Sequence, residues 1–337
     1  YTPIVIDRNH AFTKVDGVLF KQMLKMLSLD FICNYDSLIL KDTKKINKLA
    51  FALDMAVAGR SDESVWIRQA QEIRKQMTDS LIDSAFTYLP EGVKHDEIEL
   101  IKQKLKRRRL ELEAVASQYY RLLQRTPVVA GTNQSDYFLI ERQAPDRTIL
   151  RIYDPETGDC RLEQQFSGKE TKELWLYGLA GNDTFEVKGN TRKDFPIYLI
   201  SGEGENQYQL NHSRKIHVYD KDYKYDYQKI KYHKISFTPW GIYDSDKGIS
   251  LGTFFTYTMY GFKRAPFTYQ HRIGYNYLKG FMYAGVFPNY DGRRRLYLNA
   301  SISSPRNFEN FFGFGNNTAG YKEEKKNYNR VKLRTYM

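Results

Sequence analysis

The stretch from Gly248 to Met337 alternates between apolar and polar side chains with a period of two. Because successive side chains of a β-strand point to opposite faces, this alternation predicts strands with one apolar and one polar face. Five strands are predicted here, separated by turns, over residues 248–261, 268–278, 281–287, 293–303 and 329–337.

Segments of about ten residues with this alternation are typical of transmembrane β-strands. In a barrel of such strands one face meets lipid and the other lines the lumen. We expect the following residues to face lipid: Ile249, Leu251, Phe255, Tyr257, Leu296, Leu298, Ala300, Ile302, Val331 and Leu333. We expect a basic and polar set to face the lumen: Arg295, Asn299, Arg330, Lys332 and Arg334.

Residues 1–125 are predicted to be mainly helical. Helix starts are indicated at Ser61-Asp62-Glu63, at the cap Thr78-Asp79, and at Asp96-x-x-Glu99, which has the spacing of a capping box. The apolar positions after Asp96 recur every three or four residues to about Gln124, which predicts a long helix packed on its neighbours.

Residues 126–235 are predicted to be β-rich, and the barrel strands are expected from residue 236 onward. Two similar units lie in this region, 174–187 and 197–210, each with a strand, a glycine-containing turn, an Asn or Asp position and a second strand. This spacing is similar to the nonapeptide rungs of calcium-binding β-rolls. Calcium at Asn182, Asp183 and Asn206 is one interpretation, and a short stack of turns covering a strand edge is the other.

The first residues offer a second candidate cation site. Asp7 and Asn9 follow a short apolar strand, Ile4–Ile6, and carboxylate and amide oxygens suit Mg²⁺. A strand end whose polar side chains satisfy local backbone donors is the alternative, and it is favoured because no second carboxylate cluster lies nearby in the sequence.

Composition narrows the classes of function to be considered. The net charge is +12, but the basic residues are dispersed, so we expect no nucleic-acid partner. Two cysteines far apart in sequence, Cys33 and Cys160, support neither a disulfide framework nor a zinc site. The aromatic content of 15% is typical of strand-rich chains and of the girdles of membrane barrels. The chain opens at Tyr1 without an initiator Met, and we expect it to be an internal piece of a longer protein.

Two segments of the second half carry a resemblance to a known family: Asp246–Pro266 with the following Tyr269-Gln-His-Arg272, and Phe308–Thr318. They resemble the outer-membrane surface-antigen family, the BamA/TamA-like barrels of Gram-negative bacteria. Upstream, Asp7-Arg-Asn-His-Ala-Phe12 and Tyr177-Gly-Leu-Ala-Gly-Asn-Asp-Thr-Phe185 are similar to a subgroup in which a calcineurin-like metallophosphoesterase domain precedes the barrel. The first motif departs from that subgroup, because Asn9 and His10 stand where the family has Asp and Gln.

The resemblance implies an α+β chain with a helical connecting region, a short β-roll-like or antiparallel β region, and the first strands of an incomplete antiparallel transmembrane barrel. It also implies a bacterial outer-membrane location with the residues before about 236 in the periplasm. Outer-membrane lipid is the implied partner, with other outer-membrane proteins as clients or accessory subunits. Such barrels act in protein assembly, translocation or surface display by strand pairing, without covalent chemistry. The Asp-x-His pair of a two-metal phosphoesterase does not occur in this sequence, so such activity would belong to an upstream domain.

Two other functions stay open at this point. Residues 1–60 are consistent with part of a kinase-like or hydrolase site completed elsewhere, in which Asp7 is the candidate catalytic residue. The C-terminal half is consistent with a soluble β-rich binding module, in which Leu251, Phe255, Leu296 and Leu298 would be buried against a second sheet.

Overall fold

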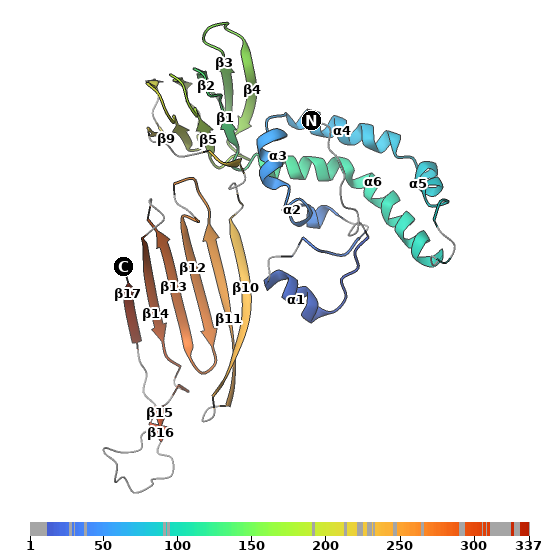
Figure 1. The fold of residues 1–337 in the computed structure, drawn as a ribbon, viewed down its shortest axis with the longest axis vertical. Coiled ribbons are helices and arrows are strands. Elements are labelled where there is room, and N and C mark those ends of the chain that lie inside the picture. Colours follow the sequence, from blue (N-terminus) through green and yellow to red (C-terminus); the bar gives the residue numbers. More distant parts are fainter. Residues whose placement is uncertain are drawn as a thin grey trace. The chain divides into compact units, whose positions relative to one another are not determined.

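The computed structural model describes residues 12–26, 29, 31–36, 39–89, 92, 95–190, 193–211, 214–220, 225–227, 231, 233–244, 248–263, 266–289, 294–304, 306–307, 309–310, 325–326 and 331–336. They fall into two compact units, one ending at Lys229 and the other beginning at Ile230, with the short segment Lys25–Leu27 grouped with the second. The fold class is α+β: a helical N-terminal region, then a parallel and a mixed sheet, then an antiparallel sheet that is not closed into a barrel (Figure 1).

The helices of the first unit are short except for the last. They are α1 (Val18–Met26), the 3-10 turn η1 (Leu40–Asp42), α2 (Thr43–Ile46), α3 (Phe51–Val57), α4 (Glu63–Gln76), α5 (Asp79–Ala85) and α6 (His95–Leu123). None of the helices in the described part of the chain is both long and apolar enough to cross a membrane.

The three predicted helix starts agree with the observed starts of α4, α5 and α6 to within a few residues. Thr78 caps α5 as expected, because its hydroxyl oxygen accepts a hydrogen bond from the backbone N–H of Leu81 at 3.1 Å. Helix α4 begins at Glu63 with Asp62 as the N-cap residue. Helix α6 already begins at His95, so Asp96 lies inside the first turn rather than before it. A carboxylate in the first turn still stabilises the helix, because it lies near the positive end of the helix dipole.

Aromatic packing and hydrogen bonds hold α3, α4 and α6 together. The Trp66 ring meets the Tyr119 ring edge-on, with centroids 5.9 Å apart. The Tyr119 hydroxyl in turn donates to Asp54 Oδ2 at 2.6 Å. Two glutamines join this helical layer to the sheets, since Gln124 and Gln164 both donate to the Gly59 carbonyl, at 2.9 and 2.8 Å.

Two sheets follow the helices. The first sheet has the order β1-β5-β7-β9 and all its pairings are parallel. The second has the order β4-β3-β2-β6-β8, with β2, β6 and β8 parallel and β3 and β4 antiparallel. The strands are β1 (Val128–Ala130), β2 (Tyr137–Gln143), β3 (Arg147–Tyr153), β4 (Cys160–Ser167), β5 (Leu174–Tyr177), β6 (Thr184–Gly189), β7 (Ile197–Ile200), β8 (Gln207–Leu210) and β9 (Ile216–Tyr219).

The two sequence repeats are neighbouring rungs of this two-sheet stack. Each rung runs from the first sheet through a turn into the second: β5 to β6, and β7 to β8. The structure adds a third rung, β1 to β2, which pairs in parallel with the β5 to β6 rung. Of the β-roll-like and antiparallel arrangements expected for this region, the three stacked parallel rungs correspond to the first, and β3 and β4 are antiparallel.

The core of the first unit lies between these sheets. Fully buried apolar side chains come from both of them, and Phe138 stacks on Phe185 with centroids 4.6 Å apart. Tyr208 occupies the same position in the next rung, and its ring stacks on that of Phe185 with centroids 5.7 Å apart. Like side chains at like positions of successive rungs thus pack in columns, as expected for a parallel stack.

The second unit is an antiparallel sheet with the order β10-β11-β12-β13-β14-β17. Its strands are β10 (Lys234–Asp244), β11 (Gly248–Met259), β12 (Tyr269–Asn276), β13 (Gly280–Pro288), β14 (Arg295–Ile302) and β17 (Val331–Tyr336), and β15 (Glu309–Asn310) pairs separately with β16 (Lys325–Lys326). The five predicted strands are present. Strand β10 is an addition to them, and its Pro239 is tolerated because β10 lies at the edge of the sheet.

Candidate functional site

The antiparallel sheet of the second unit carries one continuous apolar face. The pairing register places Phe237, Phe255, Ile273, Tyr283 and Ala300 in a single row across five neighbouring strands. Adjacent rows on the same face contain more such side chains, among them Ile235, Tyr243, Ile249, Leu251, Tyr257, Tyr275, Phe281, Leu296, Leu298 and Ile302.

Most of these side chains are exposed although they are large and apolar. Ile249 is 75% exposed, Leu251 71%, Phe255 54% and Ile273 57%. Exposed apolar surface of this extent marks an interaction site, because contact with water is unfavourable by about 25 cal/mol per Å².

Aromatic side chains on this face pack against one another across neighbouring strands. Tyr257 lies near Tyr269, with centroids 6.1 Å apart, and His271 Nδ1 lies 2.8 Å from the Tyr283 hydroxyl oxygen. Tyr275 packs on Phe281 at 4.8 Å. Phe237, Phe255 and Tyr283 share one row, so the aromatic residues are spread over the face.

The opposite face is richer in polar side chains, which are cross-linked by hydrogen bonds, and it also carries Trp240, Ile242, Phe254, Met282, Val286 and Tyr297. Ser250 donates to Asn276 Oδ1 at 2.6 Å, Gln270 donates to the Thr258 hydroxyl at 2.8 Å, and Arg272 lies beside Thr256. Only one carboxylate occurs in the six strands, that of Asp244 at the end of β10.

The register sorts the residues expected on the two faces as the alternation predicts. The expected lipid-facing residues of β11 and β14 share the apolar face: Ile249, Leu251, Phe255, Tyr257, Leu296, Leu298, Ala300 and Ile302. Arg295 and Asn299 belong to the polar face. In β17, Val331 and Leu333 pair with Ile302 and Ala300, whereas Lys332 and Arg334 pair with Ser301 and Asn299. Arg330 lies outside the described residues.

The rung turns of the first unit hold the second set of candidates. The structure aligns the turns 131–136, 178–183 and 201–206, so that Asp136, Asp183 and Asn206 occupy the same position in successive rungs. The backbone N–H of Asp136 donates to Asp183 Oδ1, and the backbone N–H of Asp183 donates to Asn206 Oδ1, both at 2.9 Å. These oxygens join one rung to the next.

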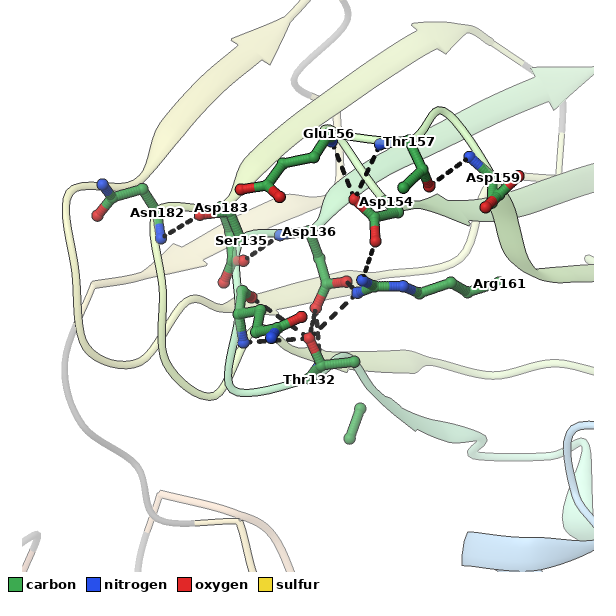
Figure 2. A network of polar contacts seen from close by, with 12 residues as sticks. Thr132, Ser135, Asp136, Asp154, Glu156, Thr157, Asp159, Arg161, Asn182 and Asp183 are labelled. Atoms are coloured by element: carbon green, nitrogen blue, oxygen red, sulfur yellow. Dashed lines mark hydrogen bonds and ion pairs between the residues drawn. The ribbon is translucent and has the colours of Figure 1, made fainter.

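A second ladder runs beside the first with the opposite direction. Asn182 donates its backbone N–H to the Ser135 hydroxyl at 3.2 Å (Figure 2). Its Oδ1 accepts from the backbone N–H of Glu205 at 2.9 Å. The three predicted calcium candidates of this region, Asn182, Asp183 and Asn206, therefore use a side-chain oxygen for a backbone hydrogen bond. Within the described ranges, no three His, Cys, Asp or Glu side chains are gathered so as to hold a metal ion. Asp7 and Asn9 lie outside those ranges.

The first rung turn contains a charged network that the sequence did not reveal. Arg161 on β4 reaches between two carboxylates, pairing with Asp136 at 2.5 Å and with Asp154 (Figure 2). Asp136 Oδ2 also accepts from the Thr132 N–H and hydroxyl, at 2.6 and 2.9 Å. The signal that marks this rung is Gly131 followed five residues later by Asp136, the same spacing as Gly178 and Asp183.

Asp183 differs from the other polar residues of the rung turns in the environment of its carboxyl group. Its side chain is fully buried, and Oδ2 has no hydrogen-bond partner among the described residues. Burial therefore raises the pKa of this carboxyl to about 7, although the N–H of Asp136 acts in the opposite direction. The protonated form of this carboxyl therefore persists to a higher pH than that of an ordinary aspartate.

No known protein family, curated protein or solved structure matches this chain.

Proposed function

We propose that the antiparallel sheet of the second unit is part of the wall of an outer-membrane β-barrel, whose apolar face contacts lipid. The observation that carries this proposal is the continuous exposed apolar face. The more polar face lies on the other side of the same strands, and this alternation is typical of a transmembrane sheet. The first unit would then lie on the periplasmic side, as the resemblance to the surface-antigen family implies.

Strand length supports this proposal. Strand β11 has 12 residues and β10 has 11, while β13 has nine. At a rise of about 3.3 Å per residue and a tilt near 45°, strands of about 9–11 residues span the hydrocarbon core. The sheet has two open edges, β10 and β17, which in lipid need further strands to satisfy their backbone groups. The rest of the wall would be supplied by additional strands.

Protein assembly or translocation at the outer membrane is the activity that this proposal favours, with outer-membrane proteins as clients. A soluble β-rich binding module is the second candidate. It requires Leu251 and Phe255 to be buried against another sheet, whereas they are 71% and 54% exposed.

Site-directed fluorescence tests lipid contact. Single cysteines are placed at Leu251, Phe255 or Ile273 on the apolar face and at Val286 or Ile242 on the polar face, after Cys33 and Cys160 are changed to Ser. In lipid vesicles, we expect labels on the apolar face to be quenched by a lipid-borne quencher and labels on the polar face by an aqueous one. Equal aqueous quenching at both sets of positions would show that the sheet is not embedded.

A further inference from the structure

A cavity of about 320 Å³ lies among β11 to β14, and its lining includes Phe254, Arg272, Met282, Ala284, Asn299 and Ser301. The register places Arg272, Ala284 and Asn299 in one row across β12, β13 and β14. Neighbouring strands lie about 4.8 Å apart, so Arg272 and Asn299 flank a gap of about 10 Å between their backbones. The small side chain of Ala284 forms the floor of that gap.

The Arg272 guanidinium is held at this cavity by two contacts. Its Nε donates to the Thr256 hydroxyl at 3.3 Å, and its guanidinium carbon lies 5.5 Å from the centroid of the Phe254 ring. The Phe254 ring is fixed in turn, because it stacks on Trp240 at 5.4 Å and lies over Gly274. A Cβ at Gly274 would approach Phe254 Cδ1 to 2.3 Å, so the glycine makes room for the ring.

No carboxylate is paired with Arg272 within the described residues. Arg295 adds a second positive charge on the same face. Asp244 is the single acidic residue of the six strands and belongs to the far end of β10. The electrostatic complement of this cavity is an anion.

We propose that this cavity binds the phosphate group of a small phosphate monoester. Arg272 supplies a guanidinium with Nη donors, Asn299 an amide N–H and Ser301 a hydroxyl, from two strands that flank the cavity. Donors arranged around a central space match the several oxygens of phosphate better than the planar pair of a carboxylate. Met282 and Phe254 offer apolar surface to the organic part of the ligand. The proposed donors, Arg272, Asn299 and Ser301, all lie on the polar face, so binding does not require lipid contact by the opposite face.

The test uses phenyl phosphate as the probe, followed by its ³¹P resonance during titration of the full chain. We expect saturable binding to the parent protein, a weakening of at least tenfold in Arg272→Gln, and a smaller weakening in Asn299→Leu. Lys279→Gln, which removes the same charge in the β12–β13 turn, should bind as the parent does. Ala284→Leu should abolish binding without a change of charge, because the larger side chain fills the cavity.

Several outcomes would overturn the proposal. The first is an absence of saturable binding to the parent protein. Equal weakening by Arg272→Gln and Lys279→Gln would show general electrostatic attraction instead of a site. Benzoate bound as tightly as phenyl phosphate would show a carboxylate site. If Arg272→Gln does not fold, as judged by circular dichroism, Asn299→Leu and Ala284→Leu decide the matter, and undiminished binding in both would overturn it.

Discussion

The backbone N–H of Asp136 donates a hydrogen bond to the side chain of Asp183, 47 residues later, at 2.9 Å. The same bond recurs one rung further on, from Asp183 to Asn206. A column of short polar side chains thus joins three turns that are distant in sequence. The third member of the column is an amide, so the column does not require a carboxylate at each rung.

Asp183→Asn is expected to remove a pH dependence from the stability of the first unit. The folded pKa of Asp183, about 7, lies above its ordinary value of 3.8. The protonated form is thus favoured on folding, so the stabilisation is fully present below about pH 4 and is lost as the pH rises through 7. The full loss amounts to about 4 kcal/mol for a shift of this size.

The measurement is the free energy of urea unfolding between pH 4 and 8. The Asn variant keeps the acceptor for the Asp136 N–H, and it should be more stable than the parent at pH 8. Asp136 and Tyr208 are the other titratable groups that interact with Asp183, and both remain in the variant. Asp159→Asn, at an exposed position, is the matched control. A pH profile that is unchanged in Asp183→Asn would contradict this account.

Gly178→Ala is expected to destabilise the rung stack by about 3 kcal/mol, the upper part of the range for overpacking. A Cβ at this position would lie 2.1 Å from Asp183 Oδ2 and 2.4 Å from the Ser201 carbonyl oxygen. One of these neighbours is backbone, so the strain is not relieved by a rotamer change. Thermal unfolding measures the effect, and Asn133→Ala, at an exposed position of the first turn, should leave the midpoint unchanged.

Arg142→Met is expected to destabilise the first unit by about 3–5 kcal/mol, because it removes one member of a buried ion pair with Asp194. The two side chains are 1% and 2% exposed, with Nη1 and Oδ2 3.5 Å apart. Arg142 also donates to the carbonyls of Arg214 and Phe195, at 2.7 and 3.1 Å.

Urea unfolding checks this prediction, with Arg147→Met as the control on the exposed start of β3. The double variant Arg142→Met/Asp194→Asn should recover part of the loss, since it also removes the buried negative charge that Arg142 had balanced. A double variant no more stable than Arg142→Met would assign the loss to the two carbonyl contacts instead.

Arginine substitutions on the apolar face are expected to have an effect that depends on position, if that face contacts lipid. Phe255→Arg, in the middle of β11, should cost about 2–4 kcal/mol in vesicles, whereas Tyr243→Arg at the end of β10 should cost about 0–1 kcal/mol. Ile242→Arg places the same charge on the polar face and should be tolerated. Unfolding by urea in vesicles gives the three values, and equal costs at Phe255 and Tyr243 would argue against a lipid-embedded face.

The sequence by itself determined the parts of the fold that depend on local periodicity. A period of two in Ile249, Leu251 and Phe255 was enough to assign their common face, because side chains alternate along any strand. The cap at Thr78 and the two glycine-containing repeats were likewise visible, since both depend on residues close together in the chain.

Only the tertiary structure decided what depends on pairing between distant segments. The turn 131–136 lacks the second glycine of the later turns, so its place as the first rung appears only when β1 and β2 pair with β5 and β6. Strand β10 contains a proline, which a strand tolerates at the edge of a sheet. Which strands lie at an edge depends on the order of the strands in the sheet. The cavity beside Arg272 has the same origin: its lining comes from four strands, which only the register brings together.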